Sequence, residues 1–439
     1  MPEELRPRSR QDLPRRRDLK AKAAPSWRFW GLEVPVGTME TRQEASRVAQ
    51  ANHGAPGIDG VTCEEVEASG VEPLLEHRRD AVVARTYHPR RVRRKAIPQD
   101  GGTKVRVLGM PTSRDRGVQG ALTLILEPMV EADCPPGSSG YRPQRSAHAA
   151  VERVAEAMVR WKTRGIAGDR HGDCDNRCPH VLLATVATRL NEAAVRHLFK
   201  GIVKASGRKG VPQGGVISPW LSPLYLTEVA RRLERAKEVT RSGTYPSIAS
   251  ARCADARVIV VEAHRRHDGR LQAVEPRLRE AWAVLHVTIQ EEKSRRVDRA
   301  RGATFSVLGV DVRRVQSRRG GWRPWSTPMR QKRTARLRKG KERCRRYASQ
   351  PVDRVLDLLN PILRGGVRSF AVGDAHRGVG GIKDWVEKQV RRHRRRARNR
   401  KGVGWKRGRR RGRYDTLRLF HTDRVSRPQP QALPVREVP

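Results

Sequence analysis

The chain has 439 residues, of which 93 are lysine or arginine and 46 are aspartate or glutamate, so its formal net charge is +47. Apolar residues make up 37% of the sequence, which suffices for a buried core and excludes a wholly disordered basic protein. A folded chain with this charge repels itself unless a polyanion neutralises it, so nucleic acid is the first expected partner and an anionic membrane surface the second. The sequence contains no run of about 20 apolar residues, which argues against a membrane-spanning segment.

Residues 1–41 are rich in arginine, proline and alanine without a sustained period, which predicts a flexible basic lead. This segment lacks the apolar stretch of a secretory signal. The six cysteines are too few for a disulfide framework in a chain of this length, so we expect a reducing, cytoplasmic setting.

Between residues 42 and 312, strand-like and helical patterns alternate, which predicts a mixed α/β region. The runs at 257–263 and 304–312 are strand-like, whereas 271–285 has the apolar spacing of a helix. Glycine and proline clusters such as GAPGIDG, PQDGGTK and KGVPQGG predict tight loops between these elements.

The C-terminal part is strongly basic. Residues 313–390 have mainly helical patterns, and apolar residues return at 352–366. Residues 391–439 are predicted to be a basic tail, since 391–413 holds 14 lysines or arginines and no acid. As a solvated helix or as a flexible arm, that block would bind phosphates through a row of point charges.

Four motif regions occur in a specific order along the chain. They are GAPGIDGVTCEEV (54–66), the loops at 97–122 and 138–150, KGVPQGGVISPWLSPLYL (209–226), and LNPILRGGVRSFAVG (359–373). Each string alone could be an ordinary loop. Together, over about residues 54–390, they resemble the reverse transcriptase–maturase proteins encoded within group II introns.

This resemblance implies a right-hand polymerase fold of the α/β (α+β) class. Fingers and a palm with an antiparallel sheet would occupy 42–312, and an α-helical thumb or maturase domain would occupy 313–390. The implied activity is RNA-directed DNA polymerisation together with binding of intron RNA as a splicing cofactor. The implied partners are group II intron RNA, an RNA template, a DNA primer or target and deoxynucleoside triphosphates.

The resemblance also implies a metal site. In such enzymes two divalent cations, Mg²⁺ or Mn²⁺, bound by carboxylates, stabilise the attacking and leaving oxygens. Asp169 matches the metal-binding aspartate of the first catalytic motif, and Asp255 matches the first aspartate of the Tyr-Ala-Asp-Asp hairpin. Ala256 stands where the hairpin has its second aspartate, so we expect nucleotidyl transfer to be impaired.

Further residues match the nucleotide and primer sites of the family. Arg106 matches the arginine that clamps the incoming triphosphate, a role suited to a planar guanidinium. Cys174 stands where a bulky side chain normally lies against the sugar of the nucleotide. The other matched positions are Gln213, Gly214 and Gly215 under the template and nucleotide, Lys293 near the primer, and Gly309 in the primer-grip hairpin.

The thumb-like region supplies the expected contacts to RNA phosphates. These candidates are Arg364, Arg368, Arg377, Arg391 and Arg392. In LNPILRGGVRSF, Gly366 replaces an aromatic residue of the family pattern, which removes a packing or stacking group.

Several alternatives stay open. His171, Cys174, Cys178 and His180 have a spacing that could hold zinc, although it is uncommon for structural sites. No Cys/His-rich endonuclease module is recognisable after residue 420. The chain could retain weak polymerase activity, could be a catalytically dead RNA-binding maturase, or could be a decaying copy that binds nucleic acid nonspecifically.

Overall fold

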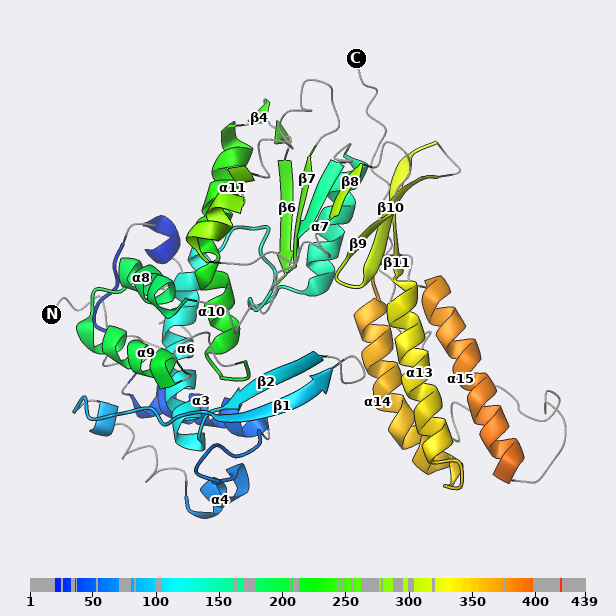
Figure 1. Cartoon of the computed structure of the whole chain (residues 1–439), viewed down its shortest axis with the longest axis horizontal. Coiled ribbons are helices and arrows are strands. Elements are labelled where there is room, and N and C mark those ends of the chain that lie inside the picture. Colours follow the sequence, from blue (N-terminus) through cyan, green and yellow to red (C-terminus); the bar gives the residue numbers. More distant parts are fainter. Residues whose placement is uncertain are drawn as a thin grey trace.

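A computed structural model of the chain shows a mixed arrangement of helices and small antiparallel sheets (Figure 1). The structure describes residues 20–24, 27–32, 36, 38–52, 54–70, 80–82, 84–99, 104–160, 164–168, 178–205, 207, 213–239, 241–242, 245–246, 248–253, 256–261, 276–277, 279–286, 295–298, 304–317, 320–373, 376–397 and 419–420. All statements about the fold below concern these residues.

Helix α6 (Ser113–Asp133) is the buried centre of the N-terminal half. Thr112 caps it, because the Thr112 Oγ1 accepts the Asp115 N–H at 3.1 Å and donates to Asp115 Oδ2 at 2.7 Å. Apolar side chains such as Leu122 and Leu126 lie on α6 within the largest core cluster. The helix is therefore enclosed by its neighbours on several sides.

The helices around α6 form the left-hand lobe in Figure 1. They are α3 (Met39–Ala51), α4 (Cys63–Ala68), α8 (Pro179–Arg189), α9 (Ala193–Ala205), α10 (Ser218–Tyr225) and α11 (Thr227–Val239). The antiparallel hairpin of β1 (Arg93–Gln99) and β2 (Lys104–Met110) extends from this lobe.

The central sheet has the strand order β6-β7-β3-β8, and each neighbouring pair is antiparallel. Its strands are β6 (Ile248–Cys253), β7 (Ala256–Val261), β3 (Arg164–Gly168) and β8 (Arg295–Asp298), and the two-residue strands β4 (Arg241–Ser242) and β5 (Tyr245–Pro246) pair separately. Alternate residues of β7 enter different cores, as expected for a strand that is covered on both faces. Val258 and Val260 pack with α7 (Ala147–Val159), whereas Ile259 and Val261 join the α6 core.

A second sheet, in the order β11-β10-β9, lies beside α7 and leads into the C-terminal helices (Figure 1). It comprises β9 (Phe305–Val307), β10 (Val310–Gln316) and β11 (Trp322–Pro328). The strand-like run at 304–312 forms two antiparallel strands with a turn at Leu308–Gly309. Gly309 therefore lies in a hairpin, as the resemblance implied. The predicted boundary at residue 312 falls inside β10.

The C-terminal helices form a bundle of α13 (Arg330–Arg346), α14 (Val352–Phe370) and α15 (His376–Ala397). The apolar stripe on α14 recurs every three or four residues and faces α13 and α15. Helix α15 continues to Ala397. Residues 391–397, which begin the basic block at 391–413, are therefore helical. No helix among the described residues has the length and apolar character needed to cross a membrane.

Gly340 allows α13 and α15 to approach closely. A Cβ atom at Gly340 would lie 3.1 Å from two ring carbons of Trp385, whereas one at Gly381 would meet nothing within 4 Å. We expect Gly340→Leu to lower the free energy of unfolding by about 1–3 kcal/mol through overpacking. The matched Gly381→Leu should be neutral or raise it by up to about 1 kcal/mol, because leucine is the better helix former. Thermal unfolding of both variants measures the difference, and equal midpoints would contradict this packing.

Candidate functional site

The register of the central sheet brings two strand ends to the same edge. Gly168, the last residue of β3, pairs with Arg257 of β7, and Cys253 of β6 pairs with Ala256. The C-terminal end of β3 therefore lies beside the end of β6 and the start of β7. Asp169, Asp255 and Cys174 lie outside the described residues, but the first two directly adjoin these strand ends in the chain.

Buried hydrogen bonds anchor the end of β6 to the loop before α7. The Arg252 N–H donates to the Gly137 carbonyl at 2.7 Å, and the Ser139 N–H donates to the Arg252 carbonyl at 2.7 Å. The Arg252 side chain, in a residue only 6% exposed, donates from Nη2 to Ser138 Oγ at 2.6 Å. The sequence motifs include this loop but do not indicate that it supports β6. Arg252 and Ser138 are 114 positions apart in the chain, and only the tertiary fold brings them together.

The loop at 213–215 docks against the β1–β2 hairpin. The Gly109 N–H of β2 donates to the Gln213 carbonyl at 2.8 Å. Gly214 has a φ of 109°, and a Cβ there would lie 3.2 Å from the Gly109 carbonyl oxygen, so both the conformation and the close approach favour glycine. Arg106 is exposed on the same strand, opposite Ile97. The structure therefore joins the strand that carries Arg106 to the segment of Gln213, Gly214 and Gly215.

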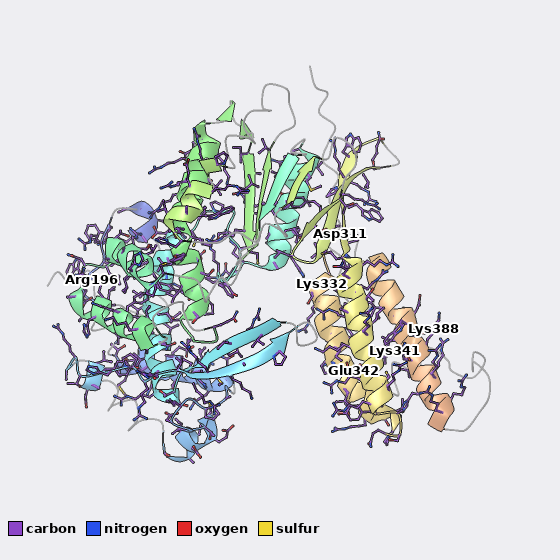
Figure 2. The ribbon with its side chains drawn as sticks, viewed as in Figure 1. Arg196, Asp311, Lys332, Lys341, Glu342 and Lys388 are labelled. Carbon is purple, nitrogen blue, oxygen red and sulfur yellow. The ribbon has the colours of Figure 1, made fainter. Side chains whose placement is uncertain are left out.

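Gly309 lies in the two-residue turn between β9 and β10. Leu308 and Gly309 both have positive φ values, 51° and 81°, as the hairpin turns that match strand twist require. The Met329 N–H donates to the Gly309 carbonyl at 2.9 Å, which ties the turn to the start of α13. Figure 2 labels Lys332 on that helix, near the hairpin. Lys293 lies outside the described residues.

A basic groove runs between α13 and α15. We call it the α13–α15 groove. It has a volume of about 210 Å³ and is lined by Lys341, Cys344, Arg345, Gln389, Arg392, His393 and Arg396. A wider hollow of about 640 Å³ adjoins it and is lined by Arg338, Lys341, Glu342, Arg345 and Arg346.

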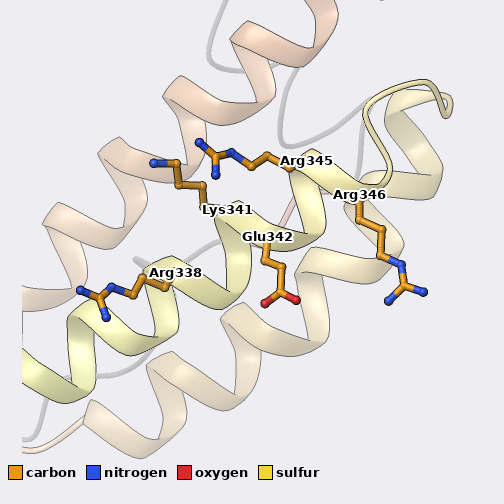
Figure 3. A pocket seen from close by; sticks show the side chains of 5 residues that line it. All are labelled: Arg338, Lys341, Glu342, Arg345 and Arg346. Carbon is orange, nitrogen blue, oxygen red and sulfur yellow. The ribbon is translucent and has the colours of Figure 1, made fainter. Parts of the chain in front are cut away.

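Lys341 and Arg345 belong to both hollows, and their side chains extend from the same side of α13 (Figure 3). Glu342 points away from them. Burial raises the pKa of the Cys344 thiol, which therefore stays neutral and adds no negative charge near pH 7. The groove thus presents cations from two helices to one space, which suits a chain of phosphates.

The predicted RNA-contacting arginines have different surroundings in the bundle. Arg392 lines the α13–α15 groove. Arg391 forms an ion pair with Glu387 on its own helix, with Nη2 and Oε2 3.0 Å apart. Arg364 and Arg368 are exposed on α14, and the Arg364 guanidinium lies 5.7 Å from the centre of the Phe420 ring. The side chain of Arg377 lies outside the described residues.

Sequence reasoning missed Lys341 and Arg345 as groove residues. Their spacing of four residues, with Arg338 three residues before Lys341, places them on one face of a helix and could have indicated a basic stripe. The partner helix α15 could not be inferred from that spacing.

The zinc alternative falls partly outside the structure, since His171 and Cys174 are not described. The Cys178 N–H donates to the Tyr225 hydroxyl at 3.1 Å, and the His180 ring lies edge-on to His286 with centres 5.9 Å apart. Within the described part of the chain, no three His, Cys, Asp or Glu residues form a group that could hold a metal ion.

Comparison with known proteins identifies relatives, although no family model matches the chain. Protein YkfC of Escherichia coli is 36% identical over 220 residues, which cover 46% of this chain and 57% of YkfC. Group II intron-encoded protein LtrA of Lactococcus lactis is 30% identical over 192 residues, covering 41% of this chain and 31% of LtrA.

An uncharacterised 91 kDa protein in the cob intron of Schizosaccharomyces pombe is 29% identical over 147 residues, which cover 31% of this chain and 18% of that protein. The chain therefore spans little more than half of YkfC and less than a third of LtrA. Two of these three relatives are described as intron proteins, in agreement with the ordered motifs. Over these segments the chain is similar to a group II intron-encoded protein and to a second intron protein.

Proposed function

We propose that this chain binds group II intron RNA as a splicing cofactor and is an RNA-directed DNA polymerase by descent with impaired nucleotidyl transfer. The α13–α15 groove is the observation that carries the RNA-binding part, because it gathers lysine and arginine side chains from two helices. Phosphate binding by such a surface requires no metal ion, so the loss of a carboxylate at Ala256 leaves it intact.

The arrangement supports a right-hand polymerase. In this proposal the β1–β2 hairpin and the helices around α6 are the fingers, and the central sheet is the palm. The bundle of α13, α14 and α15 is the thumb or maturase domain. The Gly109–Gln213 hydrogen bond supports this assignment, since it holds the finger hairpin against the loop proposed to lie under the nucleotide.

Asp169 and Asp255 would hold Mg²⁺ or Mn²⁺, which when bound would stabilise charge on the reacting phosphate oxygens. The donor set is short by one carboxylate, because Ala256 contributes a methyl group. The two remaining carboxylates fit such a cation, but with less charge than three would supply. Arg106 would contact the triphosphate, Cys174 the sugar and Lys293 the primer. Gln213, Gly214, Gly215 and Gly309 would place template, nucleotide and primer.

A reducing, cytoplasmic location is part of this proposal, because six cysteines are too few for a disulfide framework in a chain of 439 residues.

The test of RNA binding compares intron RNA with a shuffled RNA of equal length at several salt concentrations. We expect the intron RNA to bind more tightly at every salt, because a folded RNA places phosphates to match the groove. Equal affinities would contradict the splicing-cofactor proposal and favour nonspecific binding by a decaying copy. A cooperative unfolding transition of the same preparation is the control that the chain is folded.

A further inference from the structure

The distal half of the β10–β11 hairpin is a two-stranded ribbon that carries exposed aromatic surface. Strand β9 pairs only with Val310–Val312, so beyond residue 312 strands β10 and β11 pair with each other alone. Trp322 lies at the far end of this ribbon and is 37% exposed. The hairpin extends away from the helical bundle in Figure 1.

Arginine side chains lie over both tryptophan rings of the ribbon. The Arg314 guanidinium carbon is 4.0 Å from the centre of the Trp322 ring. On the opposite face, Arg313 and Arg323 lie 5.6 Å and 4.9 Å from the centre of Trp325. The strand register explains why the two tryptophans lie on opposite faces. Trp325 is directly opposite Arg313 on one face. Trp322 and Arg314 share the other face and are offset from each other by two residues along the ribbon.

The charge of the ribbon matches a polyanion. Residues 310–328 contain five arginines and a single acid, Asp311. A two-stranded hairpin buries little apolar surface by itself, so a partly exposed tryptophan at its far end adds little to a core. An aromatic ring beside guanidinium groups is the combination on which unpaired nucleobases stack while the adjoining phosphates are neutralised.

We propose that the distal β10–β11 ribbon is a binding site for unpaired bases of single-stranded nucleic acid, with Trp322 as the stacking surface. Arg314, on the same face as Trp322, holds the ring in place and neutralises the adjoining phosphates. Paired bases in a duplex do not offer their faces, so the site discriminates against double-stranded RNA. The proposal requires neither the metal site nor the α13–α15 groove, and it is independent of intron binding.

The test uses the full chain with Trp322→Ala and three probes: oligo(U), oligo(dT) and an RNA duplex, each about 12 nucleotides long to fit the site size of such proteins. At fixed salt we expect binding of the single strands to weaken roughly tenfold and binding of the duplex to stay unchanged. A loss confined to oligo(U) identifies RNA as the occupant, and a loss confined to oligo(dT) identifies DNA. Trp30→Ala is the matched control, since Trp30 is 55% exposed outside the ribbon.

Two outcomes would overturn the proposal. Unchanged binding of both single strands would mean that no base stacks on Trp322. Equal losses for duplex and single strands would mean that Trp322 supports the hairpin rather than stacking on unpaired bases. If Trp322→Ala unfolds the chain, Trp322→Phe retains an aromatic ring and serves as the second variant. Oligo(U) or oligo(dT) should then quench the tryptophan fluorescence of the parent chain more than that of Trp322→Phe, and equal quenching would also overturn the proposal.

Discussion

Replacing Ala256 with aspartate is expected to raise primer extension on an RNA template by about 10²–10⁴-fold, because it would add a charged ligand to the proposed two-metal site. Ala256 pairs with Cys253 and directly precedes Arg257, which is the partner of Gly168. A carboxylate at this position would therefore enter the sheet edge beside the end of β3. Extension by the parent chain and by Ala256→Asp should be measured with Mg²⁺ and then with Mn²⁺.

The matched control is Ala256→Asn, which has almost the same size as aspartate but no charge. It should extend no better than the parent if the missing group is a metal ligand. Adding Asp169→Ala to Ala256→Asp should abolish the gain. If Ala256→Asp unfolds cooperatively and still extends no primer, the proposed polymerase site is wrong, whereas the RNA-binding proposal is unaffected.

Reversing two charges in the α13–α15 groove is expected to weaken RNA binding and to reduce its salt dependence. Lys341 and Arg345 lie four residues apart on α13 and line both basic hollows. Loss of two phosphate contacts should reduce the slope of log affinity against log salt by about 1.4 for single strands or about 1.8 for duplexes. The measurement is a titration of Lys341→Glu/Arg345→Glu with intron RNA between about 50 and 200 mM salt, where a chain making 6–10 phosphate contacts loses about 10³–10⁵ in affinity.

The matched control is Arg196→Glu/Lys200→Glu on α9, which makes the same charge change at the same helical spacing. Figure 2 places Arg196 in the left-hand lobe, away from Lys341 in the bundle. The control variant tests the effect of net charge, and we expect it to retain most of the parent slope. Equal losses in the two variants would show that affinity follows total charge rather than the groove.

Several features could be predicted from local patterns. The ordered motifs and the net charge indicated the family, and helical spacing predicted the elements that became α13 and α14. The hairpin turn at Leu308–Gly309 was indicated by the resemblance at Gly309 and not by periodicity, because an apolar run of strand residues hides a two-residue turn. Local sequence therefore determines element type best where one period continues over several turns.

Contacts between distant segments could not be predicted in this way. Arg252 and Ser138 form a buried hydrogen bond, and no sequence pattern around either residue predicts a contact with the other. The same holds for Arg345 and Arg392, which line one groove from helices that the sequence predicts separately.

The amino-acid sequence alone determined the resemblance to group II intron-encoded proteins, the excess of positive charge and the absence of a carboxylate at Ala256, because residue identities and their order carry those properties directly. Only the tertiary structure decided which cations share a groove and which tryptophan stays exposed on a two-stranded ribbon. The physical reason is that burial and convergence depend on the packing of whole elements, which fixes neighbours that no local spacing encodes.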